Sequence, residues 1–490
     1  MRAVSTASRS SASSRPAASA RRSSSSGSVP WLAAGVLVHL LSAARVRPTN
    51  LALAHLSAIF SYALALYGTF LARSGLLGDF SVHSFSGTGV GLWLVAVDAI
   101  VALAGLSLLV WRAGKFPKGS PYPAHRSREF FLLLGCLALT FLAIIVFIGM
   151  SMPLLTGLGG DSAAVDTGFY VKTSLPLAIC MLLAMAVGSL LHYGEGQASL
   201  PKALIGAIFA GAAAAGLAGV REVSSLVLAG VATAAAFASV LAWRGGALRL
   251  AAAVAHAGAA LALFTIALAA AGTSTTLEFV PDEPQSFGRN SILYEGMDLS
   301  ESRREKEYVF RVDGEEVRAL TKLSASGEDA AREPAIAHGA AGDIYIAPSP
   351  AAVGHEIVLQ RGKAILEGDV AYRLEHVIEE EPDDEGRRLF LADIAVTDGE
   401  TVDLAEVSLT AAGMKAATES FAVLNGKRRL RLLGISEDKK SIMLQILPAL
   451  EEEARLPLTA SVSEKPLLWL LWLGAAFVFV GTSCAVRRRC

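Results

Sequence analysis

Long apolar segments fill the first half of the chain, and short alternating segments fill most of the second half. A helix that crosses a bilayer core of about 30 Å needs about 20 apolar residues at a rise of ~1.5 Å each. Nine segments reach or approach this length: residues 30–45, 51–72, 89–112, 129–155, 173–194, 203–220, 225–243, 250–272 and 466–486. The pattern therefore predicts an α-helical, polytopic membrane bundle of about nine spans.

The stretch between the last two spans, about 273–465, follows a different pattern. Its apolar and polar residues alternate in short runs that Gly, Asp and Pro interrupt, which is typical of half-buried strands. The clearest runs are 308–312, 344–347, 356–359, 389–396 and 430–433. We predict a β-rich domain, a compact barrel or sandwich, inserted before the final span. It carries no hydrolase or phosphate-binding motif, so no catalytic residue is assigned.

These patterns divide the chain into five predicted parts. Residues 1–29 form a Ser- and Arg-rich tail whose composition predicts disorder. The eight-helix bundle follows at 30–272 and the β-rich domain at 273–465. The final helix then spans 466–486, and a basic tail occupies 487–490.

Composition and charge agree with a membrane protein and set its orientation. Hydrophobic residues make up 53% and charged residues 18% of the chain, and the mean hydropathy is +0.49. If the basic tail is cytoplasmic and the spans alternate, ten Lys and Arg lie in the cytoplasmic loops of the bundle and three on the other side. The same alternation places the acidic 273–465 domain outside the cytoplasm. Lipid is the expected surrounding, and a nucleic-acid partner is excluded because no basic face lies outside the tails.

The N-terminus conflicts with this orientation. Alternation places it outside, although residues 1–29 hold five Arg and no acidic residue. One interpretation is an organelle transit peptide, which is rich in Arg and Ser and poor in acids. The other, which we favour, is that this start is not native and that an odd number of spans precedes it.

Two histidines within spans are candidate metal ligands, because histidine is costly to bury in lipid and is commonly functional there. His39 lies six residues before Arg45, and His256 lies six residues after Leu250, so both sit ~9 Å inside the cytoplasmic face. Two neutral imidazoles at equal depth on different helices can bind one haem iron axially. The alternative is two unrelated histidines that form hydrogen bonds between helices. His55 lies near the same face and is a rival for either position.

A second candidate site follows the second span, within residues 68–85. Arg73 can pair with a haem propionate, His83 can bind iron, and Phe80 and Phe85 can cover the flat ring. The alternative is an aromatic belt at the membrane interface that contains an incidental histidine.

At these residues the sequence resembles the CcmF family, the haem lyase component of cytochrome c maturation. The pattern GTFLxRSG…SVHxF at 68–85 is similar to the family's signature loop, which follows a tryptophan-rich haem-binding region. The segment from Trp31 to His39 resembles the end of that region and the helix with one transmembrane haem ligand. Residues around His256 resemble the second ligand segment. Further similar segments occur in order at 127–129, 149–153, 168–176, 332–334, 342–345 and 469–482.

The resemblance implies haem-binding roles for five residues. His39 and His256 would bind a b-type haem in the bundle, which reduces the iron of the substrate haem. His83 would be one of two external histidines that hold the substrate haem, with Trp31 and Arg73 also among the cofactor-binding residues. The family's tryptophan-rich motif, its other external histidine and several N-terminal spans have no counterpart here. A truncated frame or a naturally split protein would explain this, with a separate chain supplying the missing half.

The function implied by the resemblance is that of a haem lyase subunit in a bacterial inner membrane, with 273–465 on the periplasmic side. An organelle inner membrane is the less favoured location. The implied partners are an extracytoplasmic haem chaperone, apocytochrome c and its thiol-reducing partner. Whether the chain is itself an enzyme is left open. There are two alternatives to this function. One is a haem transporter or export component, which would use the same histidines. The other is an inactive fragment of a split lyase, which would use none of them.

Overall fold

The computed structural model describes residues 28–73, 91–157, 165–194, 201–299, 305–323, 329–349, 353–382, 388–399, 401–412, 415–418 and 420–487. His83, almost all of the 1–29 tail and the end of the basic tail lie outside these ranges. The chain forms two compact units. One is built from Thr276–Ala335 and Ile346–Val462, and the other contains the apolar helices together with Ile336–Tyr345 and the final span.

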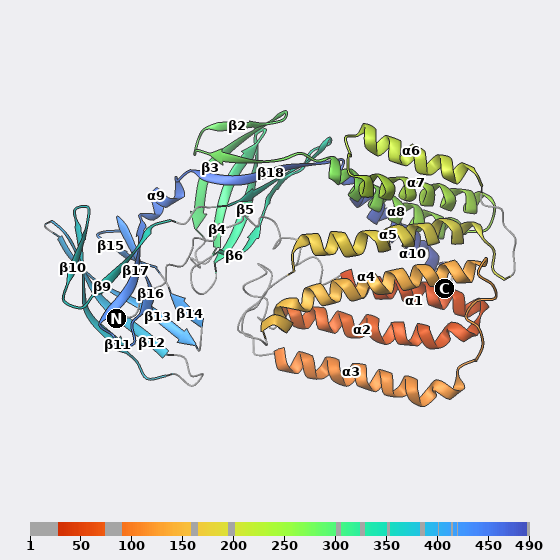
Figure 1. Ribbon diagram of the computed structural model, residues 1–490, viewed down its shortest axis with the longest axis horizontal. Coiled ribbons are helices and arrows are strands. Elements are labelled where there is room, and N and C mark those ends of the chain that lie inside the picture. The colour runs from red at the N-terminus through yellow and green to blue at the C-terminus, as the bar shows by residue number, and fades with distance from the viewer. Residues whose placement is uncertain are drawn as a thin grey trace, which may run out of the picture. The chain divides into compact units, whose positions relative to one another are not determined.

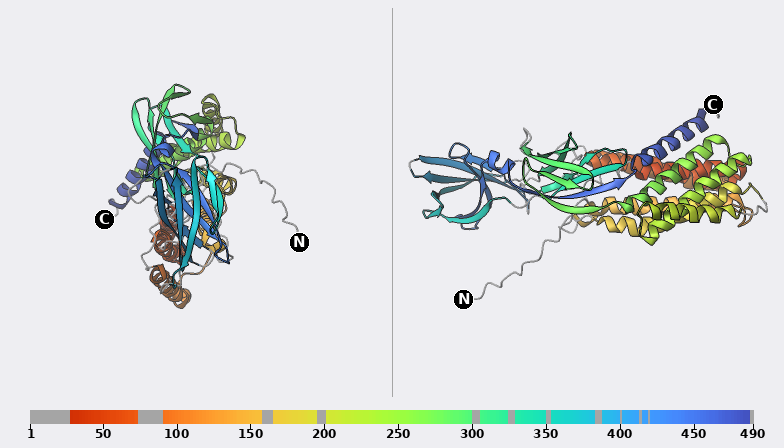
Figure 2. Two further views of the ribbon diagram at one scale, coloured as in Figure 1. Left: turned by 90° about the vertical axis from the view of Figure 1, so that its left-hand side faces the viewer. Right: turned by 90° about the horizontal axis from the view of Figure 1, so that it is seen from above.

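Apolar helices at the predicted positions form the bundle (Figure 1). They are α1 (Ser28–Val46), α2 (Leu51–Arg73), α3 (Gly91–Arg112), α4 (Arg128–Gly157), α5 (Thr167–Leu190), α6 (Ala203–Leu217), α7 (Val223–Arg244), α8 (Leu250–Leu268) and α10 (Trp469–Arg487). Short 3-10 turns accompany them at η1 (Pro48–Asn50), η2 (Ala113–Lys115) and η3 (Ala269–Ala271). Among the described residues, eight helices are long and apolar enough to cross a membrane. The axes of the helices are roughly aligned with one another, and α10 is inclined to the rest (Figure 2).

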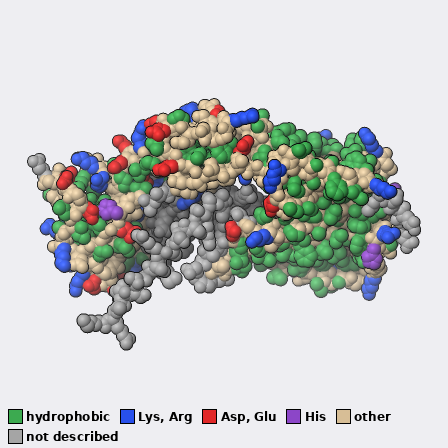
Figure 3. Space-filling view, turned by 45° about the horizontal axis from the view of Figure 1, so that its top comes forward, with side chains coloured by type: hydrophobic (Ala, Val, Ile, Leu, Met, Phe, Trp, Pro, Cys, Tyr) green, Lys and Arg blue, Asp and Glu red, His purple; other side chains and the backbone are tan. Residues whose placement is uncertain are grey.

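The surface of these helices is suited to lipid rather than to water. Large apolar side chains such as Leu92, Trp93 and Val110 on α3 are exposed. Figure 3 shows hydrophobic side chains covering the helical part, with Lys and Arg gathered at its ends. In lipid the backbone must satisfy its own hydrogen bonds, which these helices do internally. The chain is therefore a polytopic membrane protein, as its sequence predicts.

Several helices differ by a few residues from their predicted bounds, and α5 and α6 are two of them. α5 begins at Thr167 rather than at 173, so Lys172 lies inside the helix and Pro176 is accommodated within it. α6 ends at Leu217 rather than at 220, and its 15 residues are shorter than a full span. It ends there because Gly219 has φ 105°, a left-handed conformation that glycine adopts without strain, and Val220 donates back to the carbonyl of Ala215.

Strands make up most of the insert, which confirms the β-rich prediction. They are β1 (Ser274–Phe279), β2 (Pro284–Phe287), β3 (Asn290–Leu299), β4 (Glu305–Val312), β5 (Glu315–Leu323), β6 (Asp329–Glu333), β7 (Ala335–Ala337), β8 (Gly342–Pro348), β9 (His355–Gln360), β10 (Ala364–Glu367), β11 (Val370–Glu379), β12 (Arg388–Asp398), β13 (Thr401–Ala412), β14 (Lys415–Thr418), β15 (Ser420–Val423), β16 (Arg428–Ile435), β17 (Ser441–Pro448) and β18 (Leu458–Pro466). The sheet orders are β1-β18-β8-β7, β2-β3-β4-β5-β6, β10-β11-β12-β13-β14 and β15-β16-β17-β9. All five runs singled out in the sequence lie in strands.

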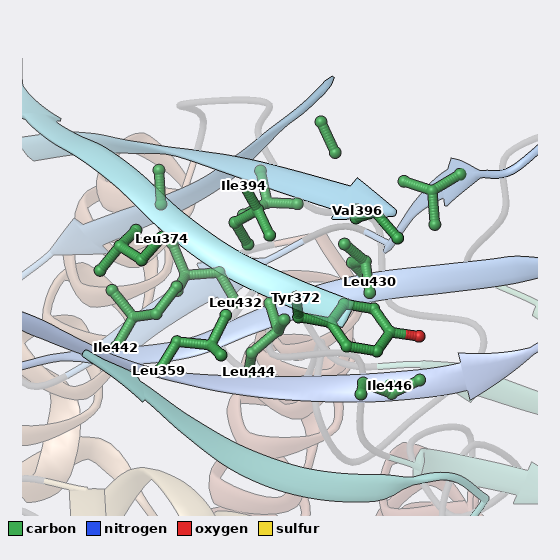
Figure 4. Packing of buried hydrophobic residues seen from close by; sticks show 14 of the residues in the cluster. Leu359, Tyr372, Leu374, Ile394, Val396, Leu430, Leu432, Ile442, Leu444 and Ile446 are labelled. Atoms are coloured by element: carbon green, nitrogen blue, oxygen red, sulfur yellow. The ribbon is translucent and has the colours of Figure 1, made fainter. Parts of the chain in front are cut away.

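The last two of these sheets share one hydrophobic core and so form a sandwich (Figure 4). Burial alternates along the strands, as on β17, where Ile442, Leu444 and Ile446 point inward while Met443 is exposed. This period of two is the reason the apolar pattern predicts a strand. The sheet β2–β6 buries a separate set of side chains, including Phe310, whose ring centroid lies 5.2 Å from that of Tyr294.

A short helix, α9 (Leu450–Ala454), ties the strands of this unit together through Glu453. Its Oε1 accepts from Lys306 Nζ on β4 at 2.9 Å, and its Oε2 accepts from Arg429 on β16. Burial disfavours the ionised carboxylate, but the two cations outweigh burial, so the pKa of Glu453 lies below its ordinary value. The side chain is nearly inaccessible to solvent, so we expect this ion cluster to contribute to stability.

Candidate functional site

The imidazoles of His39 and His256 lie together inside the bundle. His39 is on α1 and His256 is on α8, yet their ring centroids are 6.0 Å apart and the ring planes differ by 9°. Counting residues from the charged helix ends predicts equal depth for the two side chains. The structure goes further and brings the two rings to the same place.

A backbone hydrogen bond fixes the orientation of His39. Its Nδ1 lies 2.7 Å from the carbonyl oxygen of Gly35, one turn earlier on α1. Since a carbonyl only accepts, Nδ1 carries the proton and Nε2 of the neutral ring carries a free lone pair. Metal-binding histidines commonly have this arrangement, in which the second nitrogen donates to a carbonyl and orients the ring.

His256 is left with an unsatisfied nitrogen. Its Nδ1 is buried and has no hydrogen-bond partner among the described residues. A buried polar atom without a partner costs free energy, and such atoms are rare in stable folds. Only a group that bonds to Nδ1 itself, by accepting its proton or by binding its lone pair, would remove that cost.

The centroid distance of 6.0 Å is one that two imidazoles bound to the same metal ion can have. A metal–imidazole bond is about 2 Å long, and two such bonds with the ring radii added place the centroids roughly 6 Å apart. Within the described ranges, no three or more His, Cys, Asp or Glu come together to hold a metal ion. Two axial histidines suffice, however, for an iron whose other four positions a porphyrin fills. The residues present therefore fit a haem.

The position of His256 depends on how α8 packs against α10. A Cβ on Gly258 would lie 2.5 Å from the carbonyl oxygen of Gly474, and a Cβ on Gly481 would lie 2.6 Å from that of Ala251. Only glycine allows the two backbones to approach so closely. This contact fixes the rotation of α8, and with it the direction in which His256 projects.

A buried arginine stabilises one end of the bundle. Arg128, in the first turn of α4, donates to the carbonyl oxygens of Gly188, Ser189 and Ala247 at 2.9–3.1 Å. Its guanidinium also lies 5.1 Å from the ring centroid of Tyr193. The predicted span begins at 129, so the sequence leaves Arg128 just outside the helix, whereas the structure buries it in the first turn of α4. In the sequence, the feature that points to Arg128 is that residues 127–129 resemble a segment of the CcmF family.

The neighbouring Glu129 is also buried. Both of its carboxylate oxygens accept from the backbone N–H of Gly194, at 3.0 and 3.2 Å, and Arg47 lies 4.0 Å away. Arg128 and Glu129 together join α4, the end of α5 and the turn between α7 and α8. This network holds α8 at the end nearer to His256.

The other candidate residues lie apart from the His39 and His256 pair. His55 is exposed, bonds its Nδ1 to the carbonyl of Leu51 and places its ring 5.3 Å from that of Phe116. Trp31 is 61% exposed and precedes His39 by eight residues of α1, which is ~12 Å along the helix axis. Arg73 is exposed at the last residue of α2.

Curated relatives match about a third of the chain. The "Cytochrome c-type biogenesis protein CcmF" of Haemophilus influenzae is 32% identical over 173 residues, which are 35% of this chain and 26% of that protein. The CcmF of Pseudomonas aeruginosa is 34% identical over 169 residues, 34% of this chain and 25% of that protein. Part of the chain is CcmF-like. The "Probable cytochrome c-type biogenesis protein NrfE" of Escherichia coli is 33% identical over 165 residues, 33% of this chain and 29% of that protein.

The matched segment spans between 25% and 29% of each of these relatives. The solved structure named "Cytochrome c Heme Lyase CcmF" is also similar, with a TM-score of 0.44 and 17% sequence identity over 93% of this chain and 58% of that one. No protein-family model matches the sequence.

Proposed function

We propose that the chain is the haem-binding membrane component of a cytochrome c maturation system, a haem lyase subunit whose bundle holds a b-type haem between His39 and His256. The observation that carries this proposal is the two parallel imidazoles with centroids 6.0 Å apart on α1 and α8. The names of the CcmF-like relatives, which describe cytochrome c-type biogenesis, support it independently.

The chain's own residues supply binding and orientation. Gly35 holds the proton of His39 on Nδ1, so Nε2 is the binding atom. The glycine contact between α8 and α10 positions His256. A haem bound there supplies one-electron transfer toward a substrate haem at the outer face. His83, Arg73 and Trp31 are proposed to hold that substrate.

The lyase reaction joins each haem vinyl group to a cysteine thiol of apocytochrome c. The S–H adds across the vinyl C=C bond, which forms one S–C bond and one C–H bond, and nothing leaves. Such a reaction depends on holding the haem reduced and on orienting its vinyl edge toward the thiols. No side chain of the described residues is assigned as a catalytic acid or base.

The location and partners follow from charge and from the reaction. We place the chain in a bacterial inner membrane with the acidic β-rich insert on the periplasmic side, because basic residues concentrate at the opposite ends of the helices. Its proposed partners are an extracytoplasmic haem chaperone that delivers haem, apocytochrome c, and a partner that keeps the apocytochrome thiols reduced.

Visible spectroscopy of the full chain, purified in detergent from haem-replete cells, tests the proposal. We expect a b-type haem band that His39→Ala and His256→Ala each abolish. His55→Ala is the matched control, because His55 has the same Nδ1 bond to a carbonyl one turn earlier but lies apart from the pair. A band that survives in the double variant, or that His55→Ala removes, would overturn the assignment.

A further inference from the structure

A histidine at the tip of a hairpin is oriented by a buried carboxylate. The hairpin joins β7 to β8, and His338 begins its loop. His338 Nδ1 lies 3.0 Å from Asp343 Oδ2. The Asp343 side chain is only 6% exposed, whereas the His338 side chain is 71% exposed. The carboxylate is therefore part of the fold, and the imidazole is presented to the outside.

The loop that presents His338 has little freedom. The other oxygen of Asp343 accepts from the backbone N–H of Gly339 at 3.4 Å. A Cβ on Gly339 would lie 2.6 Å from the carbonyl oxygen of Gly342, and a Cβ on Gly342 would lie 2.8 Å from that of Lys465. These close approaches require glycine at both positions. A tightly packed loop of this kind fixes its side chains more firmly than a free hairpin tip would.

The same loop is anchored to the start of the final membrane helix. Trp469 Nε1, in the first turn of α10, donates to the carbonyl of Ala340 at 3.2 Å. The backbone N–H of Leu467 donates to the carbonyl of Ala341 at 2.9 Å. Tryptophan is enriched where a span meets the membrane surface. The loop that begins with His338 therefore lies beside the start of α10, where we expect the membrane surface.

The chemistry of the pair is that of a metal ligand. A carboxylate that accepts from Nδ1 fixes the proton there and leaves the Nε2 lone pair free on the exposed part of the ring. Carboxylate–histidine pairs of this form orient and strengthen histidine ligands in metal sites. A porphyrin suits the position, because its apolar ring can lie at the lipid boundary while its iron needs only one axial nitrogen from this side.

We propose that His338, oriented by Asp343, is an axial ligand for the iron of a porphyrin bound at the membrane interface beside α10. This inference rests on the proposed function, which makes haem the porphyrin that the protein handles. His338 is the binding residue, and Asp343 is a positioning residue that acts through it. The sequence alone predicts only a solvated or structural role for His338.

The test is titration of the full chain in detergent micelles with ferric protoporphyrin IX, followed by the Soret band and by electron paramagnetic resonance. All variants are made in a chain that already carries His39→Ala and His256→Ala, so that the bundle pair cannot contribute to binding. The same series is repeated in a chain that carries His39→Ala alone. We expect His338→Gln to weaken binding roughly tenfold or more, and Asp343→Asn to weaken it by about tenfold. The glutamine amide can still donate to Asp343, so the loop keeps its hydrogen bond.

Two further variants separate ligation from a structural role. His338→Cys should bind with a Soret band and resonance signals of thiolate-ligated iron, which a merely structural residue would not produce. His355→Ala is the matched control, because His355 is also exposed and paired with a carboxylate, but through Nε2 and with the half-exposed Glu367. We expect the His355→Ala variant to bind ferric protoporphyrin with the same affinity as the chain in which it is made. Metal-free protoporphyrin should bind all variants equally.

The inference is overturned if His338→Gln binds ferric protoporphyrin with the affinity and spectrum of His355→Ala. It is also overturned if metal-free protoporphyrin separates the variants, since iron would then not be what His338 recognises. A wild-type chain without a haem band dependent on His39 and His256 overturns the proposed function instead. Binding that depends on His338 is measured separately from that band, so the two failures are distinguishable.

Discussion

Gly258 of α8 and Gly474 of α10 pack backbone against backbone, so closely that a Cβ on either would lie within 2.7 Å of the other's carbonyl oxygen. His256 is two residues from this contact. The glycines therefore do more than let two spans associate. They set the direction of a candidate haem ligand.

Gly258→Val should accordingly empty the bundle site while His256 itself is unchanged. The added side chain meets backbone atoms of α10, so the helices must separate or rotate, at a cost of about 1–3 kcal/mol or more. We expect a haem-to-protein ratio well below that of the wild type and a lower unfolding temperature. Gly206→Val in α6 is the control, because a Cβ there has open space. Equal haem content in the two variants would contradict this role of the contact.

Arg128→Leu should destabilise the bundle more than other arginine substitutions nearby. The change leaves the carbonyls of Gly188, Ser189 and Ala247 without their shared donor, and hydrogen bonds to a charged group are worth about 1.5–3 kcal/mol each. Thermal unfolding in detergent measures the loss. Arg126→Leu, at an exposed position two residues earlier, should unfold like the wild type. The unfolding temperature of Arg128→Lys should lie between those of the wild type and Arg128→Leu, because an ammonium keeps the charge but cannot form the several directed hydrogen bonds of a guanidinium.

Glu453→Gln should destabilise the β-rich unit at neutral pH by about 3–5 kcal/mol, since it leaves Lys306 and Arg429 without their shared anion. The pKa of Glu453 is lowered in the folded state, so its ionised form stabilises the fold above the ordinary carboxyl pKa. This contribution disappears as the pH falls through the lowered value. The difference in unfolding temperature between wild type and Glu453→Gln should therefore be large at pH 7 and shrink in strong acid.

The exposed neighbour Glu452 provides the control for that experiment. Its carboxylate lies 3.7 Å from Arg428 and is 60% exposed, so solvent screens the pair. Glu452→Gln should change stability little at any pH. A difference that did not narrow in acid would show that Glu453 acts through its shape and not through its charge.

The sequence predicts the helices well, because an apolar run long enough to cross a bilayer has few alternatives to a helix. The early start of α5 and the early end of α6 escape prediction. The turn at Gly219 that ends α6 depends on backbone bonds that apolarity does not encode. Alternation likewise predicts the strands, and the sandwich is one of the two architectures expected. The grouping into four sheets depends on pairings between distant strands, as between β9 and β17, which no local pattern contains.

The candidate sites, like the fold, are predicted by the sequence only in part. Depth within a span can be counted from charged helix ends, so the sequence predicts His39 and His256 as a level pair. The mutual approach of α1 and α8 is a tertiary property, as are the three carbonyls around Arg128. His338 and Asp343 stand five residues apart in the sequence, but their contact exists only because the β7–β8 hairpin reverses the chain. His83 lies outside the described residues, and its role stays a prediction.

The packing of α10 on α8 also imposes an order on biogenesis. α8 emerges from the ribosome before the entire β-rich insert, and α10 emerges after it. Until α10 arrives, the glycine face of α8 lacks the close backbone contact that sets the direction in which His256 projects. A chain whose translation stops within the insert should therefore enter the membrane but fail to retain a prosthetic group, so that cofactor loading itself reports that synthesis has been completed.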